Sequence, residues 1–216
     1  MRDRSEPLVA AASRASHRGG LGVSKGEATK QAVLDQAVEV ASRLGLSGLT
    51  IGTLATQVDL SKSGLFAHFR SKEQLQLQVL AHARETFTAQ VIRPALSAPR
   101  GEKRLRTLFE AWLVIGRESA PGCLFVSAAT EFDDQPGAVR DQLVRDHRDL
   151  MESLALMFRT GISEGEFRED ADPEQFAHDL HGVMLQYFHA VRLIRDPAAE
   201  TRTRRSFDTL LDNARI

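Results

Sequence analysis

The sequence is short of cysteine, of aromatic residues and of long apolar runs. The single cysteine among 216 residues, Cys123, excludes a disulfide framework and any zinc site built from several cysteines. Aromatic residues make up 6% of the chain, with one Trp and one Tyr, which argues against a β-sandwich or barrel. The longest apolar run near the start, residues 8–12, is too short for a signal peptide or a membrane span. These absences predict a cytoplasmic protein with no membrane partner.

The rest of the composition is that of an ordinary soluble globular protein. The chain is 42% hydrophobic and 26% charged, and 216 residues bury enough surface to fold without disulfides or a bound metal. Its net charge of −1 is unevenly distributed, because residues 1–75 carry ten basic and seven acidic side chains. A basic N-terminal third beside an acidic remainder indicates that only the first part meets a polyanion.

Apolar residues recur every three or four positions along most of the chain, and no stretch alternates with the period of two that a strand requires. Spacing and capping signals predict nine helices, at about residues 24–44, 51–58, 61–68, 71–91, 101–119, 124–132, 137–160, 174–195 and 198–214. Ser61, Ser71 and Asp172 are expected as N-caps, Gly45 as the end of the first helix and Pro94 as the end of the fourth. The predicted fold class is all-α.

Two short predicted helices, 51–58 and 61–68, are joined by a tight turn in the basic third of the chain, which is typical of a helix-turn-helix. The second helix of such a motif enters the major groove, about 12 Å wide, and small polar residues at its N-terminus let it approach the bases. Ser61, Lys62, Ser63 and Gly64 meet this demand. Lys72 begins the next helix, where its charge opposes the helix dipole and a nearby phosphate would stabilise it. The pattern predicts double-stranded DNA as a partner.

This segment resembles the DNA-binding domain of the TetR family of transcriptional repressors. The stretch L-S-K-S-G-L-F-A-H-F-R-S-K at residues 60–72 is similar to the family signature V-S-K-G-T-L-Y-H-Y-F-x-S-K, and residues 29–75 align with the family without a gap. Residues 1–24 are rich in Arg, Ser, Gly and Ala and have no apolar period, which predicts a mobile arm. The resemblance implies a three-helix DNA-binding domain at 25–75 with its helix-turn-helix at about 50–69, and an effector-binding and dimerisation domain at 76–216.

The resemblance also implies roles for individual residues. Thr50, His68 and Lys72 would contact phosphates, and Lys62, Ser63, Gly64 and Ala67 would face the bases. The chain departs from the signature at Phe66 and Ala67, which stand where the family has Tyr and a polar or aromatic residue. Operator sequence and affinity are therefore not transferable from a relative.

The C-terminal two-thirds resembles the family's ligand-binding domain in layout. Bulky apolar side chains that suit a cavity for a small, largely apolar effector are Phe109, Trp112, Leu113, Phe125, Phe132, Met157, Met184 and Phe188. The segment 174–195 is apolar nearly all round, and a helix of that kind needs a second partner surface. By resemblance, it pairs with the last helix and with their copies in a homodimer through Phe176, Leu180, Tyr187, Val191, Phe207, Leu210 and Leu211.

Other features have simpler interpretations. His178 and His181, with His189 two turns on, lack the carboxylates that would complete a metal site, so no metal is expected. Cys123 has no flanking cations to lower its pKa and is interpreted as a small hydrophobic residue, with a redox sensor as the alternative. The arm at 1–24 is interpreted as a disordered tail, with added DNA contacts as the alternative.

Together these features predict a ligand-responsive DNA-binding regulator. We expect a homodimeric repressor that a small-molecule effector releases from a palindromic operator, with no cofactor and no catalytic residues. The alternative is an all-α carrier or enzyme that uses the C-terminal cavity. It is disfavoured because no nucleophile–base pair, phosphate-binding loop or metal-ligand spacing supports it.

Overall fold

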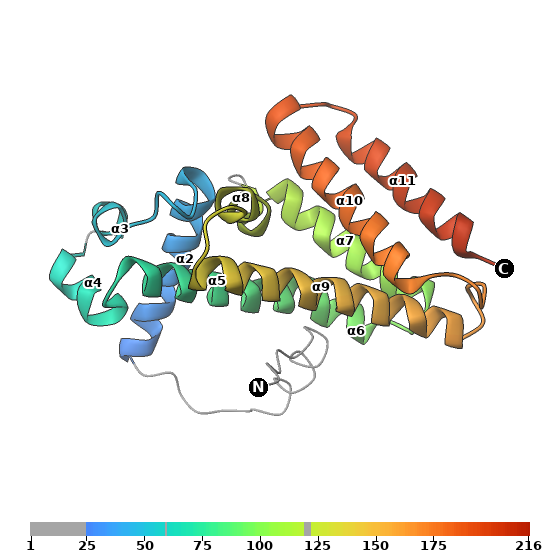
Figure 1. Cartoon of the computed structure of the whole chain (residues 1–216), viewed down its shortest axis with the longest axis horizontal. Coiled ribbons are helices and arrows are strands. Elements are labelled where there is room, and N and C mark those ends of the chain that lie inside the picture. The colour runs from blue at the N-terminus through green and yellow to red at the C-terminus, as the bar shows by residue number, and fades with distance from the viewer. Residues whose placement is uncertain (1–24, 59, 119–121) are drawn as a thin grey trace. The chain divides into compact units, whose positions relative to one another are not determined.

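The computed structural model describes residues 25–58, 60–118 and 122–216, which are helical apart from short connections (Figure 1). The predicted arm at 1–24 and the turn residue Asp59 lie outside these ranges. The helices are α2 (Lys25–Leu44), α3 (Ile51–Val58), α4 (Lys62–Phe69), α5 (Lys72–Phe87), η1 (Thr88–Ile92), α6 (Arg93–Ser97), α7 (Glu102–Glu118), α8 (Leu124–Phe132), α9 (Ala138–Ser163), α10 (Pro173–His189), η2 (Ala190–Ile194) and α11 (Ala199–Ala214). When α5–η1–α6 and α10–η2 are each counted as one continuous helix, the described residues form nine, and the all-α prediction is confirmed.

The contacts divide the described residues into two compact units. The N-terminal unit contains residues 25–58, 60–86 and 122–146, and the C-terminal unit contains residues 87–118 and 147–216. This division differs from the predicted boundary after residue 75, because α5 continues to Phe87 and because α8 packs with α2.

One apolar cluster forms the core of the N-terminal unit. It joins α2, α3, α4, α5, α8 and the first turns of α9. Leu54 in α3 and Leu65 and Phe69 in α4 are fully buried in this cluster, which fixes the face that each short helix turns inward. Replacing a buried Phe by Ala lowers the unfolding free energy by about 3–5 kcal/mol, so Phe69 strongly stabilises the packing of α4 against this core.

The predicted caps of this unit are present. The Ser61 hydroxyl accepts the Gly64 N–H at 3.1 Å, and the Ser71 hydroxyl accepts the Gln74 N–H at 3.1 Å. Gly45 follows α2 with a φ of +84°, a conformation that glycine adopts without strain. The local signals of the sequence therefore place the ends of these helices correctly.

Pro94 does not end the fourth predicted helix, which is a correction to the sequence analysis. The helix continues to Ser97 because the segment before the proline is a π-helix, in which the Arg93 N–H donates to the Thr88 carbonyl five residues back. A proline inside a regular α-helix clashes with the preceding turn, and the wider π turn relieves that clash.

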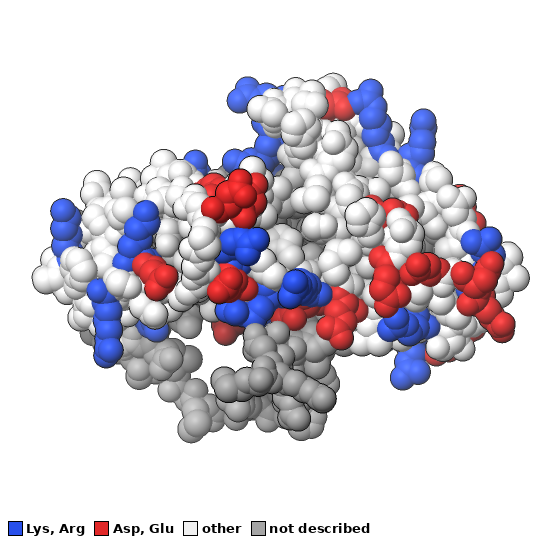
Figure 2. Space-filling model, viewed as in Figure 1, with Lys and Arg blue, Asp and Glu red and all other residues white. Residues whose placement is uncertain are grey.

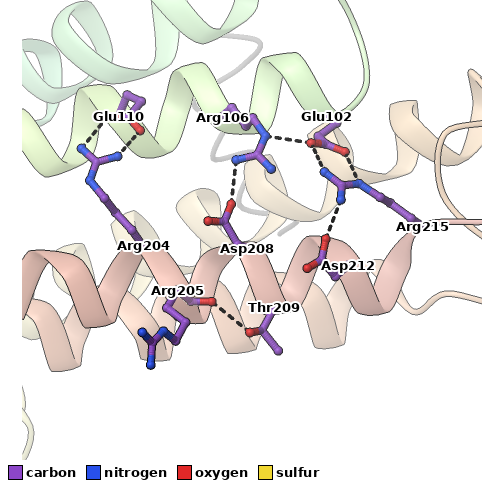
Figure 3. A network of polar contacts seen from close by, with 9 residues as sticks. All are labelled: Glu102, Arg106, Glu110, Arg204, Arg205, Asp208, Thr209, Asp212 and Arg215. Atoms are coloured by element: carbon purple, nitrogen blue, oxygen red, sulfur yellow. Dashed lines mark hydrogen bonds and ion pairs between the residues drawn. The ribbon is translucent and has the colours of Figure 1, made fainter.

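The C-terminal unit joins α7 and α11 by stacked rings and by a ladder of ion pairs. The rings of Phe109 and Phe207 stack with centroids 3.9 Å apart. Figure 3 shows the ion pairs on the same two helices, in which Glu102 contacts Arg215 at 2.6 Å and Arg106 contacts Asp208 at 2.8 Å. Each partly exposed pair is worth at most about 1 kcal/mol alone, but a connected network fixes the register of two helices.

No helix within the described ranges is both long and apolar enough to cross a membrane.

Candidate nucleic-acid interface and effector region

The second helix of the predicted motif, α4, presents its N-terminus to solvent. Ser61, Lys62, Ser63 and Gly64 are all exposed, and the hydroxyls of Ser61 and Ser63 lie 3.1 Å apart. The exposed small residues leave the end of α4 open to a close approach by another molecule. This is the arrangement that a helix needs to enter the major groove.

Thr50 and Lys62 both approach Gly52 at the first turn of α3. The position that a Cβ would take at Gly52 lies 3.6 Å from Thr50 Oγ1 and 3.8 Å from Lys62 Nζ. The same threonine caps α3 reciprocally, because the Thr53 N–H donates to the Thr50 hydroxyl at 3.0 Å and the Thr50 N–H donates to the Thr53 hydroxyl at 2.9 Å. A hydroxyl, an ammonium group and a helix N-terminus at one place suit an anion such as phosphate.

The loop between α2 and α3 is held from two sides by residues distant in sequence. Glu131 of α8 accepts the Leu46 N–H at 3.1 Å and the Ser47 N–H at 2.8 Å. On the other side, Lys72 Nζ donates to the Ser47 carbonyl at 2.6 Å and Gln76 Nε2 donates to the Leu46 carbonyl at 2.7 Å. The Ser47 carbonyl is thus a hydrogen-bond acceptor for Lys72 at the start of α5, a partner that the sequence analysis did not predict.

Glycine at position 45 makes the contact with Glu131 possible. A Cβ there would lie 2.8 Å from Glu131 Oε1, which is closer than side chains tolerate. The sequence analysis assigned Gly45 only to the end of a helix and assigned no role to Glu131. Glu131 lies 85 positions after Leu46, whose N–H it accepts, and no local pattern in the sequence indicates a contact at that separation.

Basic side chains lie over the α3–α4 end of the N-terminal unit. On the face shown in Figure 2, Lys and Arg are spread over this end with little acidic surface between them. His68 and Lys72 are also exposed. The residues assigned to DNA binding therefore lie at the surface, with Thr50 half-buried, around the two short helices of the N-terminal unit.

Two family models match the chain. The model of bacterial regulatory proteins of the tetR family matches residues 33–79, and the model of tetracyclin repressor-like C-terminal domains matches residues 101–207. The chain belongs to the TetR family. Members of this family are transcription regulators, so the chain is a DNA-binding regulator and not an enzyme.

Known transcription regulators match the chain over most of its length. A protein from Xanthobacter autotrophicus, named an uncharacterized HTH-type transcriptional regulator in the dhlA 5′ region, is 31% identical over 134 residues, which are 61% of this chain and 66% of that protein. The solved TetR-family regulator of Cytophaga hutchinsonii has a TM-score of 0.79 at 17% identity and covers 91% of this chain and 99% of its own. The one from Chloroflexus aurantiacus has a TM-score of 0.76 at 23% identity, with 87% and 94% covered. The two structures establish the fold.

The eight residues assigned to an effector cavity divide between the two units. Phe132 is buried in the core of the N-terminal unit and Phe125 packs against that core. Six lie in the C-terminal unit and are buried there: Phe109, Trp112, Leu113, Met157, Met184 and Phe188. The last six are therefore the ones that share one apolar interior.

Trp112 and the half-buried His181 bring polar groups to that interior, and the C-terminal unit also buries Asp149, Ser153 and Thr203. The Trp112 indole N–H is buried and has no hydrogen-bond partner within the described residues, and its ring centroid lies 6.4 Å from that of His181. Burial, together with the neighbouring His147 and His178, lowers the pKa of His181 to about 4, so its imidazole is neutral at neutral pH. Among the described residues, no cluster of three or more His, Cys, Asp or Glu is arranged for a metal ion.

Five of the seven residues assigned to the dimer interface are buried inside the single chain. They are Phe176, Leu180, Tyr187, Phe207 and Leu211, whereas Val191 and Leu210 are half-buried. Helices within the chain itself cover the faces that carry these five residues, and their place in a dimer interface stays a prediction. The exposed apolar residues nearby are instead Leu185, Leu193 and Ile194, of which Leu193 is 73% exposed.

Two adjoining grooves run along α10 and α11 of the C-terminal unit. One has a volume of about 780 Å³ and is lined by Val183, Gln186 and Ile194 among others, and the second, of about 430 Å³, is lined by His178 and Leu210. Both share Gly182, at which an added Cβ would meet no atom within 4 Å. This surface is apolar, hollow and open.

Proposed function

We propose that this TetR-family chain is a homodimeric repressor that a small, largely apolar effector releases from a palindromic operator. DNA binding is supported by the exposed N-terminus of α4. It is also supported by Thr50 and Lys62, which both approach Gly52 at the first turn of α3. In this arrangement α4 enters the major groove, and the hydroxyl, the ammonium group and the free N–H groups of α3 bind the phosphate backbone.

The C-terminal unit supports an effector with apolar bulk and a hydrogen-bond acceptor. Its interior holds the six buried side chains described above, which suit an apolar molecule. The unpaired Trp112 N–H would donate to an acceptor on that molecule, and the neutral His181 adds no charge beside it. A binding preference of about 1–3 kcal/mol for one conformation is enough to change operator occupancy 5–150-fold.

The grooves along α10 and α11 support the homodimer. A second copy related by a two-fold axis places Leu185 and Leu193 of each chain against the grooved surface of the other. A two-fold dimer presents two α4 helices to two half-sites, which requires a palindromic operator.

The salt dependence of DNA binding tests the phosphate contacts. Lys62→Gln and Lys72→Gln remove one positive charge each, and Lys103→Gln on α7 of the C-terminal unit is the matched control. Removing one phosphate contact is expected to lower the slope of log Kd against log salt concentration by about 0.9. Fluorescence anisotropy with a labelled duplex at several salt concentrations measures the slope. Equal slopes for wild type and both variants would contradict the assignment.

A further inference from the structure

The recognition helix α4 exposes apolar side chains as well as burying them. Leu65 and Phe69 are fully buried against the core of the N-terminal unit, whereas Phe66, the next residue after Leu65, is 51% exposed. Ala67 is exposed as well. The outer side of α4 also carries the exposed polar residues Lys62, Ser63 and His68, so Phe66 and Ala67 are the apolar side chains that it presents to solvent.

The outward direction of Ala67 and Phe66 follows from helix geometry. Each residue of an α-helix is rotated by about 100° from the last, so Ala67 points away from Leu65 and Phe66 lies on the flank between them. Ser63, one turn before Ala67, shares the outermost position. On its outermost side and on one flank, α4 therefore offers a groove one hydroxyl, one methyl group and one phenyl ring, and the exposed His68 lies on the other flank.

The long polar side chain at the start of α4 is turned elsewhere. Lys62 extends toward Gly52 at the first turn of α3, next to Thr50. Its ammonium group lies 3.8 Å from the position of a Cβ at Gly52, near the α3 N-terminus that suits a phosphate. The short side chains of Ser63, Gly64 and Ala67 let α4 lie deep in a groove, which brings the ring of Phe66 to the edges of the bases.

We propose that Phe66, together with Ala67, recognises the 5-methyl groups of thymine in the operator. The 5-methyl of thymine is the apolar group that a standard base pair displays in the major groove, and aromatic rings and alanine methyls are the side chains that contact it. The inference rests on the proposed function, because it specifies what the same DNA-binding surface recognises. It assigns sequence specificity to the position at which the chain departs from the tyrosine of the family signature.

Replacing thymine by deoxyuridine tests this directly, because deoxyuridine keeps the pairing and the O4 acceptor and lacks only the methyl group. The operator is first selected from a random pool of duplexes by the full-length protein. Each thymine of the selected half-site is then replaced in turn. At one position or more, the replacement is expected to raise Kd about fourfold for each methyl removed.

Variants assign the methyl contact to α4. At the thymine that the ring contacts, Phe66→Ala withdraws the side chain beyond reach and is expected to bind the thymine and deoxyuridine duplexes equally. Phe66→Leu remains apolar and reaches further than alanine, so it keeps the discrimination. Leu44→Ala is the matched control, since Leu44 is 59% exposed in the same unit and lies outside α4. Circular dichroism melts show whether Phe66→Ala folds, and a half-exposed ring is expected to shift the melting temperature little.

Each outcome has a distinct meaning. Failure of the wild type to select any duplex refutes the proposed function. A selected operator whose thymines all tolerate deoxyuridine, or whose discrimination persists in Phe66→Ala, overturns the inference and leaves the regulator intact. Self-association of the DNA-free protein that requires Phe66, together with indifference to deoxyuridine, assigns the ring to a protein contact instead.

Discussion

Glu131 is expected to hold the α2–α3 loop, and Glu131→Ala measures how strongly. The variant leaves the N–H of Leu46 without its acceptor beside a fully buried side chain, and an unsatisfied donor of this kind costs about 1–3 kcal/mol. The N–H of Ser47 is exposed and turns to water, so its loss adds little. We therefore expect the N-terminal unit to lose about 2 kcal/mol of unfolding free energy.

Glu131→Gln retains one carbonyl acceptor and is expected to lose about half as much. Asp134→Ala, an exposed carboxylate just beyond α8, is the control and should change stability by less than about 0.5 kcal/mol. Urea unfolding gives the free energies, and hydrogen exchange of a peptide spanning residues 45–49 locates the change. If Glu131→Ala matches Asp134→Ala in both measurements, the carboxylate does not hold the loop.

Three further predictions concern the C-terminal unit. Because the pKa of His181 is lowered to about 4, the unfolded chain binds more protons than the folded chain between pH 6.5 and about 4, and stability falls as the pH decreases across that window. His181→Gln should flatten this part of a curve of unfolding free energy against pH. His189→Gln, at an exposed position, is the control and should leave the curve unchanged. Gly182→Trp fills the groove along α10 and α11 without a clash inside the chain. Sedimentation should therefore show a weakened dimer at unchanged monomer stability, and an unaltered dimer would show that the groove is not part of the interface. The pKa of Glu102 is lowered to about 2, chiefly by its hydrogen bond from Arg215, so its contribution is present above pH 4.5 and is lost as pH falls toward 2. Glu102→Gln should cost about 1 kcal/mol at pH 7 after allowance for solvent screening, a loss that high salt reduces.

The sequence predicted the helix ends of the N-terminal unit well, because local chemistry determines them. Ser61 and Ser71 supply acceptors to the first free N–H groups of α4 and α5, and Gly45 adopts a left-handed conformation after α2. The same short segment identified the family. Signals of this kind act over three or four residues and are visible in one sequence.

Contacts between distant segments were not predictable in the same way. The acceptor of the Leu46 and Ser47 N–H groups is Glu131, for which the sequence analysis predicted no contact. Pro94 suggested a helix end because the sequence does not reveal the π-helix that accommodates the proline.

The dimer assignment shows a second limit of periodicity. An apolar helix face requires a partner, but the pattern does not state whether that partner is another helix of the same chain or a second copy. For Phe176, Leu180 and Phe207 the partner lies in the same chain, whereas Leu193 remains uncovered. Composition alone does not separate these cases, because all four residues are strongly apolar.

Selection of bound duplexes from a random pool at near-physiological salt tests the central claim most directly. For a dimeric repressor whose two α4 helices enter successive major grooves, we predict enrichment of one palindrome with half-sites about 34–36 Å apart or a multiple of that spacing. Recovery of no preferred sequence by folded, ligand-free protein would contradict the account.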